Sequence, residues 1–109
     1  MARVQIPVTQ VTRAGVEVDA ADVPSDAVND HYFTNNGRTY LLIRNVGGSP
    51  TTATIITPDT VISDLAVSVT NGTSRIVGPF SRSRYNQAGG IVHVDVTVST
   101  DLELAAFKI

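Results

Sequence analysis

Residues 92–98 alternate strictly between valine and a polar residue. In an extended chain the valines lie on one side and the polar residues lie on the other. This period of two predicts a β-strand with one buried and one solvated face. Valine, isoleucine and threonine together make up about a third of the chain, and their branched side chains pack well on a pleated sheet. We therefore expect an all-β protein.

Several other short segments have the composition of strands and are separated by turn residues. Residues 40–43 are apolar without alternation, which is typical of a strand that is buried on both faces. Asn71 and Gly72 lie between the segments 66–70 and 73–77. Because an Asn-Gly pair readily adopts positive φ angles, it predicts a tight two-residue hairpin between these segments.

Seven or eight short strands with polar turns predict a single antiparallel β-sandwich, either jelly-roll or immunoglobulin-like. The length of 109 residues fits one domain, residues 1–109. Residues 1–13 are expected to form an extended arm or an edge strand, because Pro7 cannot donate a hydrogen bond within a central strand. The best candidate for a helix is a single turn within residues 22–29, with Ser25 as its N-cap.

The composition argues against several functional classes. Charged residues are 17% of the chain and apolar residues 42%, so much of the surface must be Ser, Thr, Asn, Gly or apolar. With a net charge of −2 and only one small basic cluster, the chain is not expected to bind nucleic acid. There is no cysteine, and no stretch is apolar for long enough to cross a membrane. We also expect no signal peptide, because no apolar core follows Met1.

Two groups of polar residues are candidates for chemistry. His93 and Asp95 lie on the solvated face of the predicted strand, but such pairs are common on surfaces without function. An acidic stretch contains Asp19, Asp22, Asp26, Asp30 and His31. It lacks the alternate ligands, central glycine and terminal glutamate of an EF-hand, so we interpret its aspartates as turn formers and caps. We expect no catalytic residue, no cofactor and no metal site.

The candidate interface residues lie in a loop and at both ends of the chain. The loop at 78–87 combines aromatic residues with arginines, which are enriched at protein interfaces. At the C-terminus, residues 102–109 are apolar on both faces, which a strand with one solvated face should not be. Within residues 1–8, apolar and polar residues alternate. The predicted interface residues are Val4, Ile6, Arg82, Arg84, Tyr85, Phe107 and Ile109.

The order of the short motifs resembles a known group of proteins. An F.N.G.T.L...N pattern begins at Phe33, Gly78-Pro79-Phe80 follows, and Tyr85-Asn86-Gln87 precedes the final strands. This arrangement resembles the small β-sandwich decoration, or cement, proteins of tailed bacteriophages. The resemblance covers most of the chain, but its motifs are loose.

The resemblance implies a non-enzymatic virion protein that binds the outside of a bacteriophage capsid and stabilises it. Its partner would be the lattice of the major capsid protein. The protein would be made in the cytoplasm of the host bacterium and would be a homo-oligomer, with a trimer as the favoured state. Two alternatives stay open: another virion component, such as a connector, tail or fibre-associated sandwich, and a carbohydrate-binding module.

Overall fold

The computed structural model describes residues 3–18, 23–58, 61–98 and 100–109, and within these residues the fold is all-β. The described part contains ten strands and one short helix, α1 (Arg82–Tyr85). The strands are β1 (Val4–Gln5), β2 (Val8–Gln10), β3 (Val23–Pro24), β4 (His31–Thr34), β5 (Thr39–Asn45), β6 (Thr51–Ile56), β7 (Leu65–Val69), β8 (Ser74–Val77), β9 (Ile91–Val96) and β10 (Leu102–Lys108).

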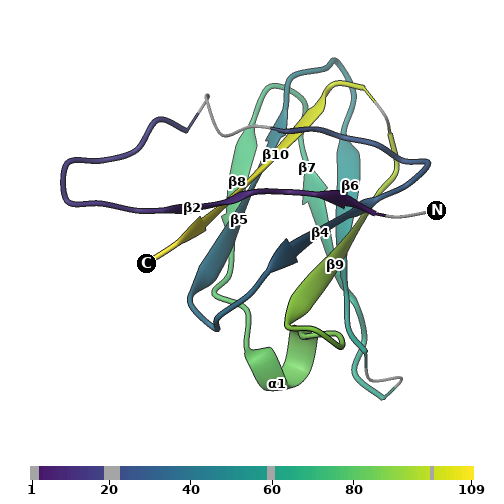
Figure 1. The fold of residues 1–109 in the computed structure, drawn as a ribbon. Coiled ribbons are helices and arrows are strands. Elements are labelled where there is room, and N and C mark those ends of the chain that lie inside the picture. The colour runs from purple at the N-terminus through teal and green to yellow at the C-terminus, as the bar shows by residue number, and fades with distance from the viewer. Residues whose placement is uncertain (1–2, 19–22, 59–60, 99) are drawn as a thin grey trace.

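The strands form two packed sheets, as expected for a sandwich (Figure 1). Sheet A has the order β1-β4-β9-β6-β7, and sheet B has the order β2-β10-β5-β8, with β3 paired to the start of β10. The antiparallel pairs are nested, since β3 pairs with β10, β4 with β9, β5 with β8 and β6 with β7. This nesting is the jelly-roll arrangement, so the fold is the first of the two sandwich types left open by the sequence.

The first strands depart from the predicted antiparallel pattern. β1 pairs with β4, and β2 pairs with β10, and both of these pairs are parallel. The N-terminal segment therefore crosses from the edge of sheet A to the edge of sheet B (Figure 1). These strands are only two or three residues long, which is too short for a period of two to reveal them.

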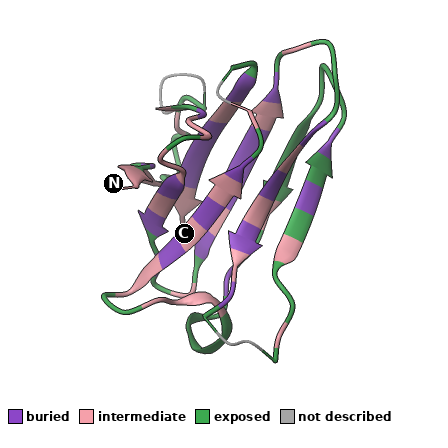
Figure 2. Cartoon of the chain, turned by 90° about the vertical axis from the view of Figure 1, so that its right-hand side faces the viewer, coloured by how far each residue is buried: buried purple, intermediate pink, exposed green. Residues whose placement is uncertain are grey.

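The core lies between the sheets and is built mainly from alternate residues of the strands, although β5 and β10 each bury three consecutive residues. Buried residues alternate with half-buried and exposed ones along the strands (Figure 2). The predicted valine strand follows this rule, because Val92, Val94 and Val96 all point inward from β9. The other large buried apolar side chains include Ile6, Phe33, Leu41, Ile43, Ile55, Val69, Phe80, Leu102 and Leu104.

The predicted hairpin at Asn71-Gly72 is wrong, although the turn itself is present. Gly72 has φ +74, as the Asn-Gly pair suggested. However, β7 and β8 on either side of the turn belong to different sheets and do not pair with each other. The turn is bonded instead to the end of β5, because the N–H of Gly72 donates to the carbonyl of Asn45 at 3.0 Å. A two-residue signal is local, so it cannot tell a hairpin from a crossover between sheets.

The single turn expected within residues 22–29 is present over residues 27–29, where the N–H of Asp30 donates to the carbonyl of Asp26 at 2.8 Å, but the predicted cap, Ser25, is wrong. The described residues of this segment form β3 and then a turn, while residue 22 lies outside the described residues. The capping side chain is Asp26, whose carboxylate accepts hydrogen bonds from the N–H groups of Val28 and Asn29. Ser25 is buried beside β10, and its N–H donates to the carbonyl of Leu102. Pairing with β10 holds the start of the segment extended, and this long-range contact outweighs the local capping signal.

Candidate functional site

The outer faces of the two sheets differ in chemistry. On sheet A the outward positions of β6, β7 and β9 are mainly polar and include Thr52, Thr54, Ser68, His93 and Asp95. An antiparallel sheet with one solvated face normally looks like this.

On sheet B, by contrast, the outward positions are mainly apolar. Tyr40 and Leu42 of β5 lie beside Phe107 and Ala105 of β10, and Ile76 of β8 lies beside Leu42. Ile76 is 71% exposed, whereas Leu42 and Ala105 are buried, so this apolar face is open to solvent in part. The solvent-facing side of a sheet in a sandwich is normally polar. The outer face of sheet B therefore stands out by its apolar side chains.

This face is hollowed into a groove of about 570 Å³. Its floor comes from β5, β8 and the end of β10, and the loop after β2 supplies further apolar residues. The groove is lined by Val11, Val16, Val18, Tyr40, Leu42, Arg44, Ser74, Ile76, Phe107 and Ile109. We call this feature the sheet B groove.

The two ends of the sheet B groove differ in charge. At one end the guanidinium of Arg44 donates to the carboxylate of Glu103 at 3.0 Å. This ion pair neutralises the positive charge of Arg44. At the other end a second hollow of about 190 Å³ shares Tyr40 and Ile109 with the groove and is also lined by Arg38. Arg38 is exposed, and its guanidinium has no hydrogen-bond or ion-pair partner among the described residues.

The predicted interface residues divide into groups. Phe107 and Ile109 line the sheet B groove, and Ile109 is 57% exposed. Arg82 and Arg84 are exposed on α1. Tyr85 is half-buried and packs edge-on against Phe80, with ring centroids 5.4 Å apart.

The N-terminal interface assignment needs correction. Ile6 is 0% exposed and belongs to the hydrophobic core of this chain. Its N–H donates to the carbonyl of Tyr32 at 2.8 Å, which continues the pairing of β1 with β4. Val4 is half-buried in β1, and its N–H donates to the carbonyl of Asp30. The alternation in this segment reflects packing against the domain itself.

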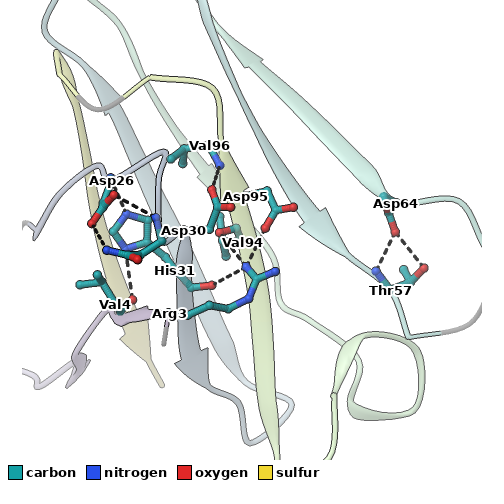
Figure 3. Close-up of polar contacts among 11 residues, drawn as sticks. Arg3, Val4, Asp26, Asp30, His31, Thr57, Asp64, Val94, Asp95 and Val96 are labelled. Atoms are coloured by element: carbon teal, nitrogen blue, oxygen red, sulfur yellow. Dashed lines mark hydrogen bonds and ion pairs between the residues drawn. The ribbon is translucent and has the colours of Figure 1, made fainter. Parts of the chain in front are cut away.

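His31 connects the N-terminal strand to the turn after β3, and it is fully buried (Figure 3). Its Nε2 accepts a hydrogen bond from the N–H of Asp26 at 2.9 Å. Its Nδ1 lies 3.2 Å from the carbonyl oxygen of Val4 and must donate to it. The two contacts together require a neutral imidazole with its proton on Nδ1. Burial lowers the pKa of His31 below its ordinary value, which agrees with this state.

The other polar groups around His31 also hold backbone in place. The carboxylate of Asp30 accepts the N–H of Val96 at 3.0 Å, and the guanidinium of Arg3 donates to the carbonyl of His31 (Figure 3). Hydrogen bonds from Asn29 lower the pKa of Asp26. Asp19 and Asp22 lie outside the described residues. Within the described part of the chain, no group of three or more potential ligands could hold a metal ion.

Asp95, the neighbour of His93 on the outer face of β9, has Arg3 as its partner. The carboxylate of Asp95 accepts a hydrogen bond from Arg3 at 2.6 Å and so is engaged by a cation. Burial lowers the pKa of His93, and the nearby Arg3 contributes to the shift. The ion pair between Arg3 and Asp95 therefore connects the N-terminal segment to β9 on the outer face of sheet A.

The motifs that suggested a phage family all have structural roles. Phe33 packs against Phe80 with ring centroids 5.5 Å apart, and both rings are buried at the end of the sandwich. The amide of Asn35 donates to the carbonyl of Phe80 and to the side chain of Asn86, and its oxygen accepts the N–H of Gly37. These residues therefore close one end of the sandwich, while Asn45 of the same pattern donates to the carbonyls of Ser49 and Val69 at the other end of β5.

In comparisons with known proteins, the chain matches no family model, no curated protein and no solved structure. Among the described residues, no helix is both long enough and apolar enough to cross a membrane. The residues that sequence reasoning missed are Ile76 and the valines of the loop after β2, which line the groove. Ile76 stands in a strand of only four residues, too short to show which face is apolar.

Proposed function

We propose that this chain is a non-enzymatic structural protein of a virus particle that decorates the outside of a bacteriophage capsid. The observation that carries the proposal is the apolar outer face of sheet B. Its Ile76 and Ile109 are exposed in a molecule whose other sheet has a largely polar outer face. An apolar patch of this kind is typical of a surface that meets a protein partner. The motif order supplies the choice of partner, the lattice of the major capsid protein.

The proposed action is stabilisation by mass action. A protein that binds the assembled shell, and not its dissociated subunits, lowers the free energy of the shell by its own free energy of binding. Copies bound at every equivalent lattice position repeat this effect over the whole particle. We propose that the bound form is a homo-oligomer, with a trimer as the favoured state, because several tethered copies bind together more strongly than one.

Cryo-electron microscopy of particles that carry this protein tests the proposal. The expected result is jelly-roll density at repeated positions on the outer capsid surface, with sheet B facing the lattice. Density confined to the tail, the connector or a fibre would contradict the decoration role. The symmetry of the density at each position would also give the oligomeric state.

A further inference from the structure

The sheet B groove has a direction, because only one of its ends carries unpaired positive charge. Arg44 at one end is neutralised by Glu103 at 3.0 Å. At the opposite end Arg38 lines the adjoining hollow, and its guanidinium has no partner among the described residues. None of the described residues that line the groove or this hollow has an acidic side chain.

One further arginine, Arg82, extends this positive end. The side chain of Arg82 lies over the turn before β5, with its Cγ 3.6 Å from where a Cβ on Gly37 would stand. Arg82 is exposed, and its guanidinium is unpaired within the described part of the chain. Two unpaired cations, Arg38 and Arg82, therefore border one end of an apolar groove. Such an arrangement favours an occupant whose negative charge is spread over more than one carboxylate.

We infer that the sheet B groove binds an apolar protein segment that carries acidic residues at one end, with those residues against Arg38 and Arg82. The floor of the groove is formed by three adjacent strands, which span about 10 Å at the usual spacing. That width accommodates one segment with its side chains, rather than a second sheet. Arg38 precedes Leu42 by four residues, or about 13 Å along an extended chain, and this sets the separation between the apolar and acidic parts of the segment.

The inference rests on the same face as the proposed function and names the chemistry of its partner. It does not require a capsid, so the two can fail separately. Peptide binding without decoration of a particle would contradict only the proposed function. Particles bound through sheet B by a segment without acidic residues would contradict only this inference.

Selection from a displayed library of random peptides, with the full chain as bait, tests the inference. The enriched peptides are expected to contain apolar residues followed or preceded by Asp or Glu. An enriched peptide should bind about tenfold more weakly to the double variant Arg38→Glu, Arg82→Glu, and the loss should shrink at high salt. Ile76→Asp should abolish binding, because it places a charge on the apolar floor.

The matched control is Thr54→Asp, which adds the same charge to the outer face of sheet A and should bind the peptide like the wild type. Circular dichroism and melting curves establish that each variant is folded before binding is compared. Three results would overturn the inference: no enrichment, enrichment of basic peptides, or equal binding by the Ile76→Asp variant. If dodecanoate binds tightly and no peptide is enriched, the groove instead accepts a small amphiphile, and the inference is wrong.

Discussion

His31 shows how a residue that invites a functional interpretation can serve the fold. Beside several aspartates in the sequence, it suggests a ligand or a base. In the structure it is fully buried, and both ring nitrogens are used by backbone groups from the turn after β3 and from β1. The sequence could place the residues near one another but could not show that backbone atoms occupy both nitrogens. The contact of Nδ1 with Val4 forms only because β1 pairs with β4, and this long-range pairing has no local sequence signal.

The role of His31 predicts a pH dependence of stability. Because burial lowers the pKa of His31 in the folded state, the unfolded chain takes up a proton more readily. The stability from neutral His31 is therefore complete above the unfolded pKa of about 6.5 and is lost as the pH falls from there toward the folded pKa. Protonation would also replace the acceptor of the Asp26 N–H with a donor. Asp26 and Asp30 oppose this shift and Arg3 reinforces it, but burial is the largest cause.

Melting curves between pH 7.5 and 5, a range chosen about the ordinary pKa of histidine, measure this effect. The wild type should melt at progressively lower temperature as the pH falls. The variant His31→Gln should show a smaller dependence on pH, whatever its stability at neutral pH. His93→Gln is the control and should retain most of the dependence, because His93 is only half-buried. An unchanged slope in His31→Gln would refute the assignment.

At the scale of strands and turns, sequence prediction was accurate where the signal was long and failed where it was short. The seven-residue valine alternation identified the buried side chains of β9. Residues 40–43 were predicted to be buried on both faces, and Leu41, Leu42 and Ile43 are buried. Residues 1–13 were predicted to form an arm or an edge strand, and β1 and β2 are edge strands. Their parallel pairing, the strand β3 and the crossover after β7 were not predicted, because pairing partners far away in the sequence decide them.

The N-terminal segment provides a prediction at this scale. Ile6 is fully buried between β1 and β2, so Ile6→Ala should destabilise the protein by about 2–5 kcal/mol. The neighbouring Pro7 is exposed, and Pro7→Ala should change stability by less than about 1 kcal/mol. Urea unfolding of both variants measures the difference. A wild-type midpoint for Ile6→Ala would mean that this segment is not packed in its own domain in solution.

At the scale of the whole molecule, the sequence predicted the sandwich but not which surface is unusual. It showed that the C-terminal strand is apolar on both faces, and the structure places those faces in the core and over the sheet B groove. It could not show that Tyr40, Ile76 and the loop after β2 join Phe107 at the same surface, because four separate segments meet there. A surface of this kind arises from topology, so no single motif could identify it.

The central claim is that the outer face of sheet B is the binding face of a capsid decoration protein. Cosedimentation with capsid shells stripped of this protein tests it directly, using the wild type, Ile76→Asp on sheet B and Thr54→Asp on sheet A. We predict that the wild type and Thr54→Asp sediment with the shells and raise their melting temperature, while folded Ile76→Asp stays in the supernatant. Equal binding by all three, or loss of binding only in Thr54→Asp, would contradict the claim.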